Sequence, residues 1–131
     1  MKLEMSNIIK EDSQEIEVIK ETEGQKVGPN WISGTKKHYL VDAAVFYLTS
    51  EELRNYEGGK YTTQDIVIEA VEGYEMTNKS TGQVEDVKIE QEDKVLYDGK
   101  TFKVDEVNNL TVHSDYYEYV AKKVNPDDWF R

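Results

Sequence analysis

The sequence predicts a mainly β fold: a small antiparallel β-barrel or sandwich with long loops and at most one short helix. Three observations predict it. Apolar residues recur at every second position, turn-forming residues separate these short segments, and an Asp-Gly pair joins two apolar runs. The length of 131 residues suits one domain with a single modest core. We expect an N-terminal arm over residues 1–15 that can be flexible, one barrel domain over residues 16–125 and a C-terminal tail over residues 126–131.

The first half of the chain contains two predicted strands with a long connection between them. Residues 16–20 have the composition of a short strand. Residues 22–37 are rich in glycine and polar residues, which predicts a long loop. Residues 38–48 form the most apolar run, and their β-branched and aromatic content favours a strand over a helix.

The middle of the chain contains the one predicted helix. Ser50 is expected at its N-cap, with Glu51 and Glu52 in the first turn, where carboxylates are favourable. Gly58 and Gly59 should end it within about two turns. The apolar residues 66–71 predict the next strand, and the polar residues 73–82 predict a mobile loop.

The clearest local prediction is a β-hairpin formed by residues 94–97 and 100–104. Asp98 and Gly99 lie between them, and this pair favours a type I′ turn, which needs positive φ at both positions. Val107 interrupts the alternation that follows, which predicts a β-bulge or a change of face. A last strand is expected over residues 116–124, ended by Pro126.

Composition excludes several classes of function. The chain has 27 acidic and 16 basic residues, a net charge of −11, and the excess acid is spread over both halves. Because DNA binding requires basic side chains to replace phosphate counterions, tight nucleic-acid binding is disfavoured. The absence of cysteine excludes disulfides and cysteine-based zinc sites. No apolar run approaches the roughly 20 residues of a membrane-spanning helix, and the N-terminus lacks the apolar region of a signal peptide.

The residue types that carry most enzyme chemistry are sparse or lack the required spacing. His38 and His113 have neither a nucleophile motif nor a metal-binding spacing, so we interpret both as surface residues. A carboxylate-based enzyme remains a rival interpretation, and it would require a deep cleft that holds a carboxylate of raised pKa.

Two segments resemble ligand-binding loops only in part. Glu90, Glu92 and Asp93 have the charge of a calcium loop but not its pattern, which favours a solvated turn. Residues 58–60 resemble a phosphate-binding loop but lack the spaced first glycine. We therefore predict no catalytic, cofactor-binding or metal-binding residues, and no cofactor.

Aromatic residues are the unusual feature of the chain, with nine Tyr, three Phe and two Trp. Tyr116, Tyr117 and Tyr119 would place rings on both faces of one strand. Such a strand can line the core with its hydroxyls reaching water, or it can be covered on its second face by a partner. Trp129 and Phe130 lie in a short tail that favours a partner or docking back onto the domain.

Three segments, in this order, resemble a known family. They are GGKYTTQD at residues 58–65 with the following strand, EDKVLYDGKTFKV at residues 92–104, and YYEYVAKKV at residues 116–124. Together they resemble the small head–tail connector proteins of tailed bacteriophages. Glu92 departs from the family pattern, which often has Gly there, and residues 1–37 match no part of it.

The resemblance implies a head-closure, or stopper, protein with a β-barrel fold and no catalysis. Such a protein forms a homo-oligomeric ring, with a dodecamer as one candidate size, below the portal and adaptor in the neck of the virion. It retains packaged DNA in its channel without sequence-specific binding and offers a docking surface to tail proteins. It assembles in the host bacterial cytoplasm and involves no membrane. The alternatives are a tail-terminator or adaptor protein of the same neck, or a generic barrel that binds a small ligand or peptide.

We interpret residues 49–64 as the segment that gates the channel, and residues 22–37 as a contact to the neighbouring ring. The candidate gate residues are Tyr56, Glu57, Gly58, Gly59, Lys60 and Tyr61. The candidate inter-ring or inter-subunit contacts are Trp31, Tyr116, Tyr117, Trp129 and Phe130.

Overall fold

The fold was obtained as a computed structural model, which describes residues 5–22, 24–32, 34–56 and 58–125. The elements are α1 (Ser6–Asp12), β1 (Ser13–Glu21), β2 (Gln25–Val27), β3 (Asn30–Ile32), β4 (Lys36–Tyr47), the 3₁₀ helix η1 (Glu52–Asn55), β5 (Ile66–Val71), β6 (Met76–Asn78), β7 (Val84–Glu85), β8 (Lys94–Tyr97), β9 (Lys100–Asn109) and β10 (Tyr116–Lys123).

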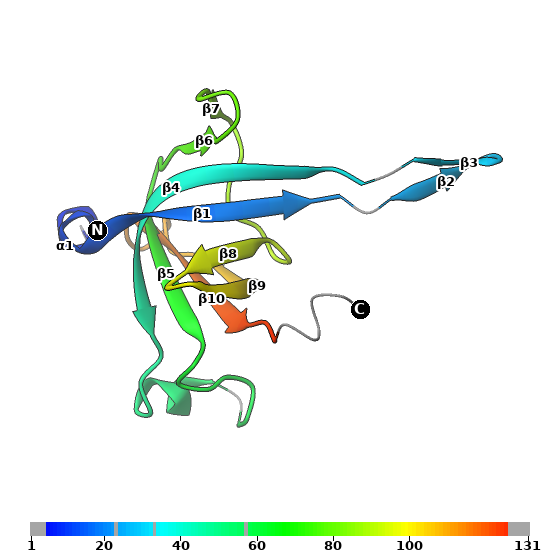
Figure 1. Ribbon diagram of the computed structural model, residues 1–131. Helices are drawn as coiled ribbons and strands as arrows, with labels where there is room; N and C mark the ends of the chain where they lie inside the picture. The colour runs from blue at the N-terminus through cyan, green and yellow to red at the C-terminus, as the bar shows by residue number, and fades with distance from the viewer. Residues whose placement is uncertain (1–4, 23, 33, 57, 126–131) are drawn as a thin grey trace.

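Six antiparallel strands close into a barrel. The strands follow the order β1-β8-β9-β10-β5-β4, and pairing of β4 with β1 closes the ring. The short strand β6 pairs with Tyr39 and Leu40 of β4, and β7 pairs with β6, so the two strands extend the sheet (Figure 1). The predicted fold class, a small mainly β protein built on an antiparallel barrel, is therefore confirmed.

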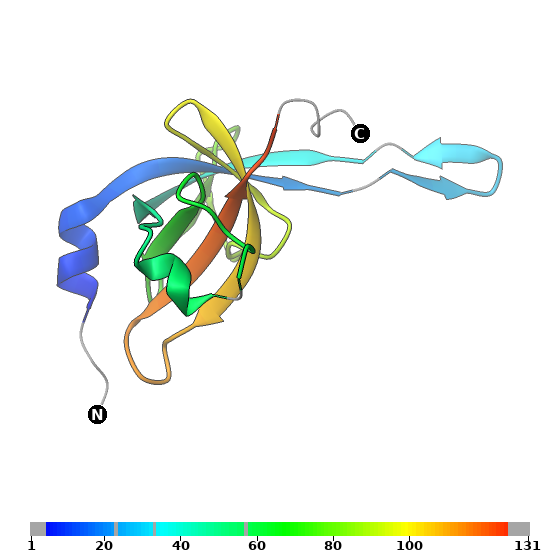
Figure 2. The ribbon, with the colours of Figure 1, turned by 90° about the horizontal axis from the view of Figure 1, so that it is seen from below.

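Strands β1 and β4 form one hairpin that reaches far beyond the barrel. Their pairing runs from Ser13 opposite Ala44 to Glu21 opposite Lys36. Beyond it, β2 and β3 pair only with each other among the described residues, and they form the far end of the projection (Figures 1 and 2). We call residues 24–32 the distal hairpin. The predicted long loop over residues 22–37 is therefore wrong for the residues that form β2, β3 and the start of β4.

Two local features make this extension possible. Thr22 and Thr35 continue the ladder between the two strand pairs, because the Thr22 amide donates to the Thr35 carbonyl at 2.9 Å and their hydroxyls lie 2.8 Å apart. Gly28 has a φ of +59° and precedes Pro29, whose ring keeps φ negative. This order of signs is that of a type II′ hairpin turn, in which glycine takes the first central position.

Helix α1 occupies part of the predicted flexible N-terminal arm. It lies against β4 and β5, and Ile9 is buried there. The Asp115 carboxylate accepts hydrogen bonds from the Met5 and Ser6 amides, at 2.7 and 3.3 Å, and these bonds hold the pKa of Asp115 below its usual value. Because this cap lies far away in sequence, no local pattern predicts the helix.

The predicted helix after Ser50 is a single 3₁₀ turn, and Thr49 provides its cap. The Thr49 hydroxyl accepts from the Glu52 amide at 3.2 Å, and the Glu52 carboxylate accepts from the Thr49 amide at 3.2 Å. This reciprocal pattern is a capping box that begins one residue earlier than expected.

Two other local predictions need correction. The segment 73–82 contains strand β6, in which Met76 and Asn78 are buried, so it is not simply a polar loop. The bulge expected at Val107 lies two residues earlier. The pairing of β9 with β10 shifts between Val104 and Glu106, which leaves Asp105 as the extra residue.

Other predictions are confirmed. The strand predicted over residues 38–48 lies in β4, which ends at Tyr47; residues 66–71 form β5; and the strand predicted over residues 116–124 is β10, which ends at Lys123. Asp98 and Gly99 both have positive φ, at +54° and +69°, as a type I′ turn requires.

The barrel interior is filled by side chains. Its largest fully buried members are Val18, Tyr39, Ile66, Ile68, Met76, Ile89, Val95, Phe102, Val104 and Tyr119. Buried tyrosine hydroxyls need polar partners, and they have them. Tyr39 donates to Glu85 at 3.0 Å, and the hydroxyls of Tyr74 and Tyr119 lie 2.6 Å apart.

We expect opposite effects on stability from introducing a glycine and from removing one at two positions of positive φ. Glu92 has a φ of +78°, a backbone conformation that is less favourable for a residue with a side chain than for glycine. Glu92→Gly should therefore raise the free energy of unfolding by about 0.5 to 1 kcal/mol, since its ion pair with Lys103 is exposed. Gly99→Ala should lower it by about 1 kcal/mol, although a Cβ there meets no other atom. Urea unfolding measures both, and a shift of both variants in the same direction would contradict the account.

Candidate functional site

The distal hairpin exposes an unusual amount of apolar surface. Val27, Trp31 and Ile32 are all more than half exposed, and Trp31 reaches 68%. Two-stranded hairpins are marginally stable alone in water, and apolar side chains at such a tip are typical of a contact surface. The candidate contact residue Trp31 therefore lies where a partner can reach it.

The indole of Trp31 is held in place although it is exposed. It lies over Gly24 on the paired strand, so close that a Cβ at Gly24 would stand 2.5 Å from the ring. Lys26 is the cross-strand partner of Trp31 and shares that face of the hairpin. The ring therefore presents its other face and the lysine together.

The candidate gate segment is anchored on both sides of its glycines. Tyr61 is only 4% exposed and packs with Leu48, Val67 and Val120 on the outer face of the barrel. Its hydroxyl donates to Asp105 at 2.6 Å, and burial together with this carboxylate raises its pKa. Tyr56 packs edge-on against Tyr61, with ring centroids 5.0 Å apart.

The tip of this segment is open to solvent. Gly58 and Gly59 are exposed, and Glu57 lies outside the described residues. Lys60 forms an ion pair with Glu106 at 2.7 Å, which ties the end of the tip to β9. After the segment, Asp65 is buried and accepts from the Thr62 and Lys123 amides. The gate hypothesis therefore rests on the exposed residues Gly58, Gly59 and Lys60.

The two tyrosines predicted as contacts lie on different faces of β10. Tyr117 packs against the core, stacked on Tyr119 and edge-on to Tyr74. Tyr116 lies on the outer face and is half-buried. Tyr117 and Tyr119 therefore line the core, whereas Tyr116 faces outward. Trp129 and Phe130 lie outside the described residues.

Two carboxylates oppose each other on the outer face near Tyr116. Glu69 on β5 and Glu118 on β10 are direct cross-strand partners. Partial burial raises the pKa of both; charge repulsion from Glu118 raises that of Glu69 further, and repulsion from Glu106 and Glu52 raises that of Glu118. Like charges in this arrangement destabilise a sheet.

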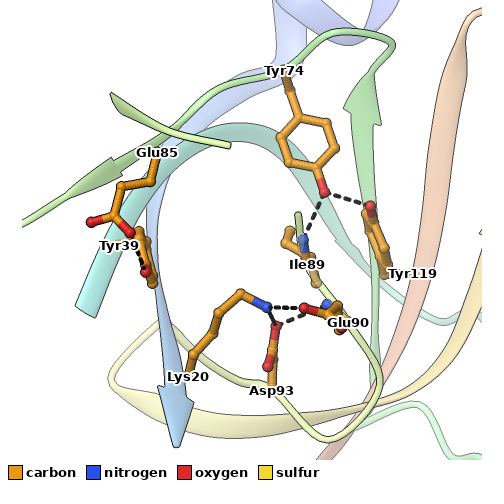
Figure 3. A network of polar contacts seen from close by, with 8 residues as sticks. All are labelled: Lys20, Tyr39, Tyr74, Glu85, Ile89, Glu90, Asp93 and Tyr119. Atoms are coloured by element: carbon orange, nitrogen blue, oxygen red, sulfur yellow. Dashed lines mark hydrogen bonds and ion pairs between the residues drawn. The ribbon is translucent and has the colours of Figure 1, made fainter. Parts of the chain in front are cut away.

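A polar network fixes the connection between β7 and β8 to the barrel (Figure 3). The Ile89 amide donates to the Tyr74 hydroxyl at 2.8 Å, and the Glu90 amide donates to Asp93 at 2.8 Å. Lys20 of β1 bonds Asp93 at 2.6 Å and Glu90 at 3.0 Å. The prediction of a solvated turn is therefore wrong for Asp93. This residue is buried, and burial raises the pKa of its carboxyl group.

An open cleft of about 670 Å³ lies on the outer surface beside α1. Leu40 and Val71 contribute apolar surface to it, and Glu15, Asp42 and Glu75 contribute carboxylates. These residues come from three strands and a turn, so no sequence pattern brings them together. The carboxylates with raised pKa are not among those that line the cleft.

Both histidines lie at the surface of the described structure. His38 is within β4 and bonds Glu17 at 2.8 Å, and His113 is in the turn before β10. Lys79 and His38 hold the pKa of Glu17 below its usual value. Among the described residues, no three acidic or histidine side chains gather closely enough to hold a metal ion.

Neither short helix in the described part of the chain has the length or apolar character that a bilayer crossing requires. The chain matches no protein-family model and no curated protein sequence. The function is therefore argued from the geometry above and from the motif resemblance.

Removal of Lys20 should destabilise the fold more than removal of an exposed ion pair of equal length. Its side chain and that of Asp93 are 17% and 11% exposed, so Lys20→Met leaves a buried carboxylate without its cation. We expect a loss of about 2 kcal/mol. The control Lys103→Met breaks a bond of the same 2.6 Å to Glu92, with side chains 48% and 67% exposed. It should cost less than about 0.5 kcal/mol in urea unfolding, and equal losses would contradict the role of Lys20.

The pair Glu69–Glu118 should make stability depend on pH. Because the pKa of both carboxyls is raised in the folded state, their penalty is present at neutral pH and is relieved as pH falls through those pKa values. Glu118→Gln should therefore stabilise the protein by about 0.2 to 1 kcal/mol at pH 7, and the gain should shrink near pH 4. Unfolding curves at both pH values measure this, with the exposed Glu51→Gln as a control that should change little. A gain that does not depend on pH would contradict the account.

Proposed function

We propose that this chain is a structural head-closure protein of a tailed-bacteriophage neck, which retains packaged DNA and offers a surface to the tail. One observation carries the proposal. The three segments that resemble the connector family lie on β5, on β8 with the first half of β9, and on β10. These strands are consecutive neighbours in the barrel, in the order β8-β9-β10-β5. The resemblance therefore describes one continuous wall of the structure rather than three unrelated matches.

The conformation of Glu92 adds support at the position where the sequence departs from the family. The family often has Gly there, and Glu92 has a positive φ that glycine adopts more easily. Its amide donates to the Val104 carbonyl at 2.9 Å, which joins the two ends of the second segment. The departure thus changes the residue but keeps the backbone that the motif requires.

The charge and the gate segment are compatible with steric retention. A net charge of −11 gives few attractive contacts to DNA, so release would be fast once a barrier moves. Residues 58–60 form a short exposed tip between Tyr56 and Tyr61, which are both packed against the barrel. A tip held at both ends can block a channel in one position and clear it by a small hinge motion.

A tail-terminator or adaptor role in the same neck is the main alternative, because the same barrel and the same motifs serve it equally. A ligand-binding barrel is favoured only by the open cleft of about 670 Å³, which lies outside the barrel rather than in its filled interior.

Co-sedimentation with DNA-filled, tailless phage heads tests the proposal. We expect the protein to bind at one vertex, visible by negative-stain imaging, and to slow DNA leakage. Deletion of residues 58–60 should preserve binding and restore leakage, because it removes the tip and leaves Tyr61 in place. Lys60→Ala, which keeps the length of the tip, should still retain DNA.

Each other outcome has a defined meaning. Binding to tails instead of heads would replace head closure with the terminator role. Binding to neither would overturn the neck assignment. Full retention after the deletion would exclude residues 58–60 as the gate.

A further inference from the structure

The distal hairpin carries a charge opposite to that of the rest of the chain. Residues 24–32 contain one lysine, Lys26, and no acidic residue, a net charge of +1, so the remainder carries −12. Lys26 forms no ion pair with a described residue and lies beside the exposed Trp31. A partner for this surface should be acidic and should offer an apolar recess for an aromatic ring.

The cleft beside α1 has these properties. Glu15 and Asp42 are direct cross-strand partners there, and both are exposed; together with Glu75 they outnumber Lys10, the one cationic side chain among the described residues that line the cleft. Leu40 and Val71 give it an apolar wall. Its volume of about 670 Å³ lies within the usual range of about 300–1,000 Å³ for small-molecule pockets, so it has room for an indole ring.

A chain cannot fill its own cleft with its own distal hairpin. Lys26, which pairs with Trp31 at the tip, lies 12 positions after Gln14 at the cleft, along β1 and β2. At about 3.3 Å per residue, the tip and the cleft are separated by roughly 40 Å. Figures 1 and 2 show α1 and the distal hairpin at opposite ends of the molecule.

We infer that Trp31 and Lys26 of one copy dock into the cleft beside α1 of a second copy, with Lys26 placed against Glu15 and Asp42. The contact joins two different surfaces, so every open assembly keeps a free tip at one end and a free cleft at the other. Head-to-tail contacts of this kind build closed rings when the rotation between copies closes, and filaments when it does not.

The inference deepens the proposed function, because it names how copies of the chain would join in a ring. Its test needs no phage component. Failure of the contact would leave binding to heads untouched, and failure of head binding would leave the contact untouched, so the two can be told apart.

Two fold-safe variants break the two sides of the contact. Lys26→Glu combined with Trp31→Ala alters only exposed side chains of the tip. Asp42→Lys places a cation opposite Glu15, which should help rather than harm the sheet. Glu51→Lys, an equal charge change on an exposed turn, is the matched control.

Sedimentation velocity at low salt measures the outcome. Protein concentrations up to about 0.5 mM are high enough to detect weak contacts. Wild type and Glu51→Lys should self-associate, and added salt should weaken the association. Each variant alone should self-associate at least about tenfold more weakly than the wild type. Their mixture should form 1:1 dimers and nothing larger, because only one intact tip and one intact cleft remain.

Three results would overturn the inference. They are a wild type that stays monomeric over this range, an Asp42→Lys variant that behaves like Glu51→Lys, and a mixture that forms no dimer. A tip variant that loses affinity for added duplex DNA while self-association stays intact would assign the hairpin to nucleic acid instead.

Discussion

The pairing of β1 with β4 is the constraint on which the rest of the structure depends. It closes the barrel, and the same ladder continues outward to carry β2 and β3 away from it. The inner part of β4 also pairs with β5, and its middle pairs with β6. A single 12-residue strand therefore determines the barrel circumference, the projection of the hairpin and the rim of the external cleft.

Polar contacts inside and beside the barrel give this small domain a defined interior. The hydroxyls of Tyr74 and Tyr119 bond each other, and Tyr74 also accepts the Ile89 amide, so the connection before β8 is fixed from within. The ion pair of Lys20 with Asp93 fixes the same connection to β1. Because these groups would be costly if unpaired, they specify one arrangement of the loop rather than merely adding stability.

The residues that carry the family resemblance serve mainly to build the barrel. Tyr61 covers the outer face over Val67 and Val120, and Asp65 ties the start of β5 to the end of β10. Glu92 makes the turn before β8. The surfaces with the most obvious capacity for contacts, the distal hairpin and the cleft, lie in or beside the segment that matches no part of the family. The distal hairpin is therefore separate from the barrel, whereas the cleft is lined by residues of the barrel strands β1, β4 and β5.

The sequence by itself determined the features that depend on neighbouring residues. The apolar, β-branched run of residues 66–71 specifies a strand, and Asp98-Gly99 specifies the turn between β8 and β9, because side-chain composition and φ preferences act over a few residues. The sequence predicts Trp31 as a candidate contact residue, and its exposure in the distal hairpin is a finding of the structure alone.

Only the tertiary structure decided the features that need partners distant in the chain. Helix α1 is capped by Asp115, the bulge at Asp105 appears only against β10, and Glu15 meets Asp42 only when β1 pairs with β4. The polar segment 22–37 gave a loop signal because its strands bury almost nothing, and hydrophobic periodicity reports burial. The segment forms strands because it continues the hydrogen-bonded ladder between β1 and β4.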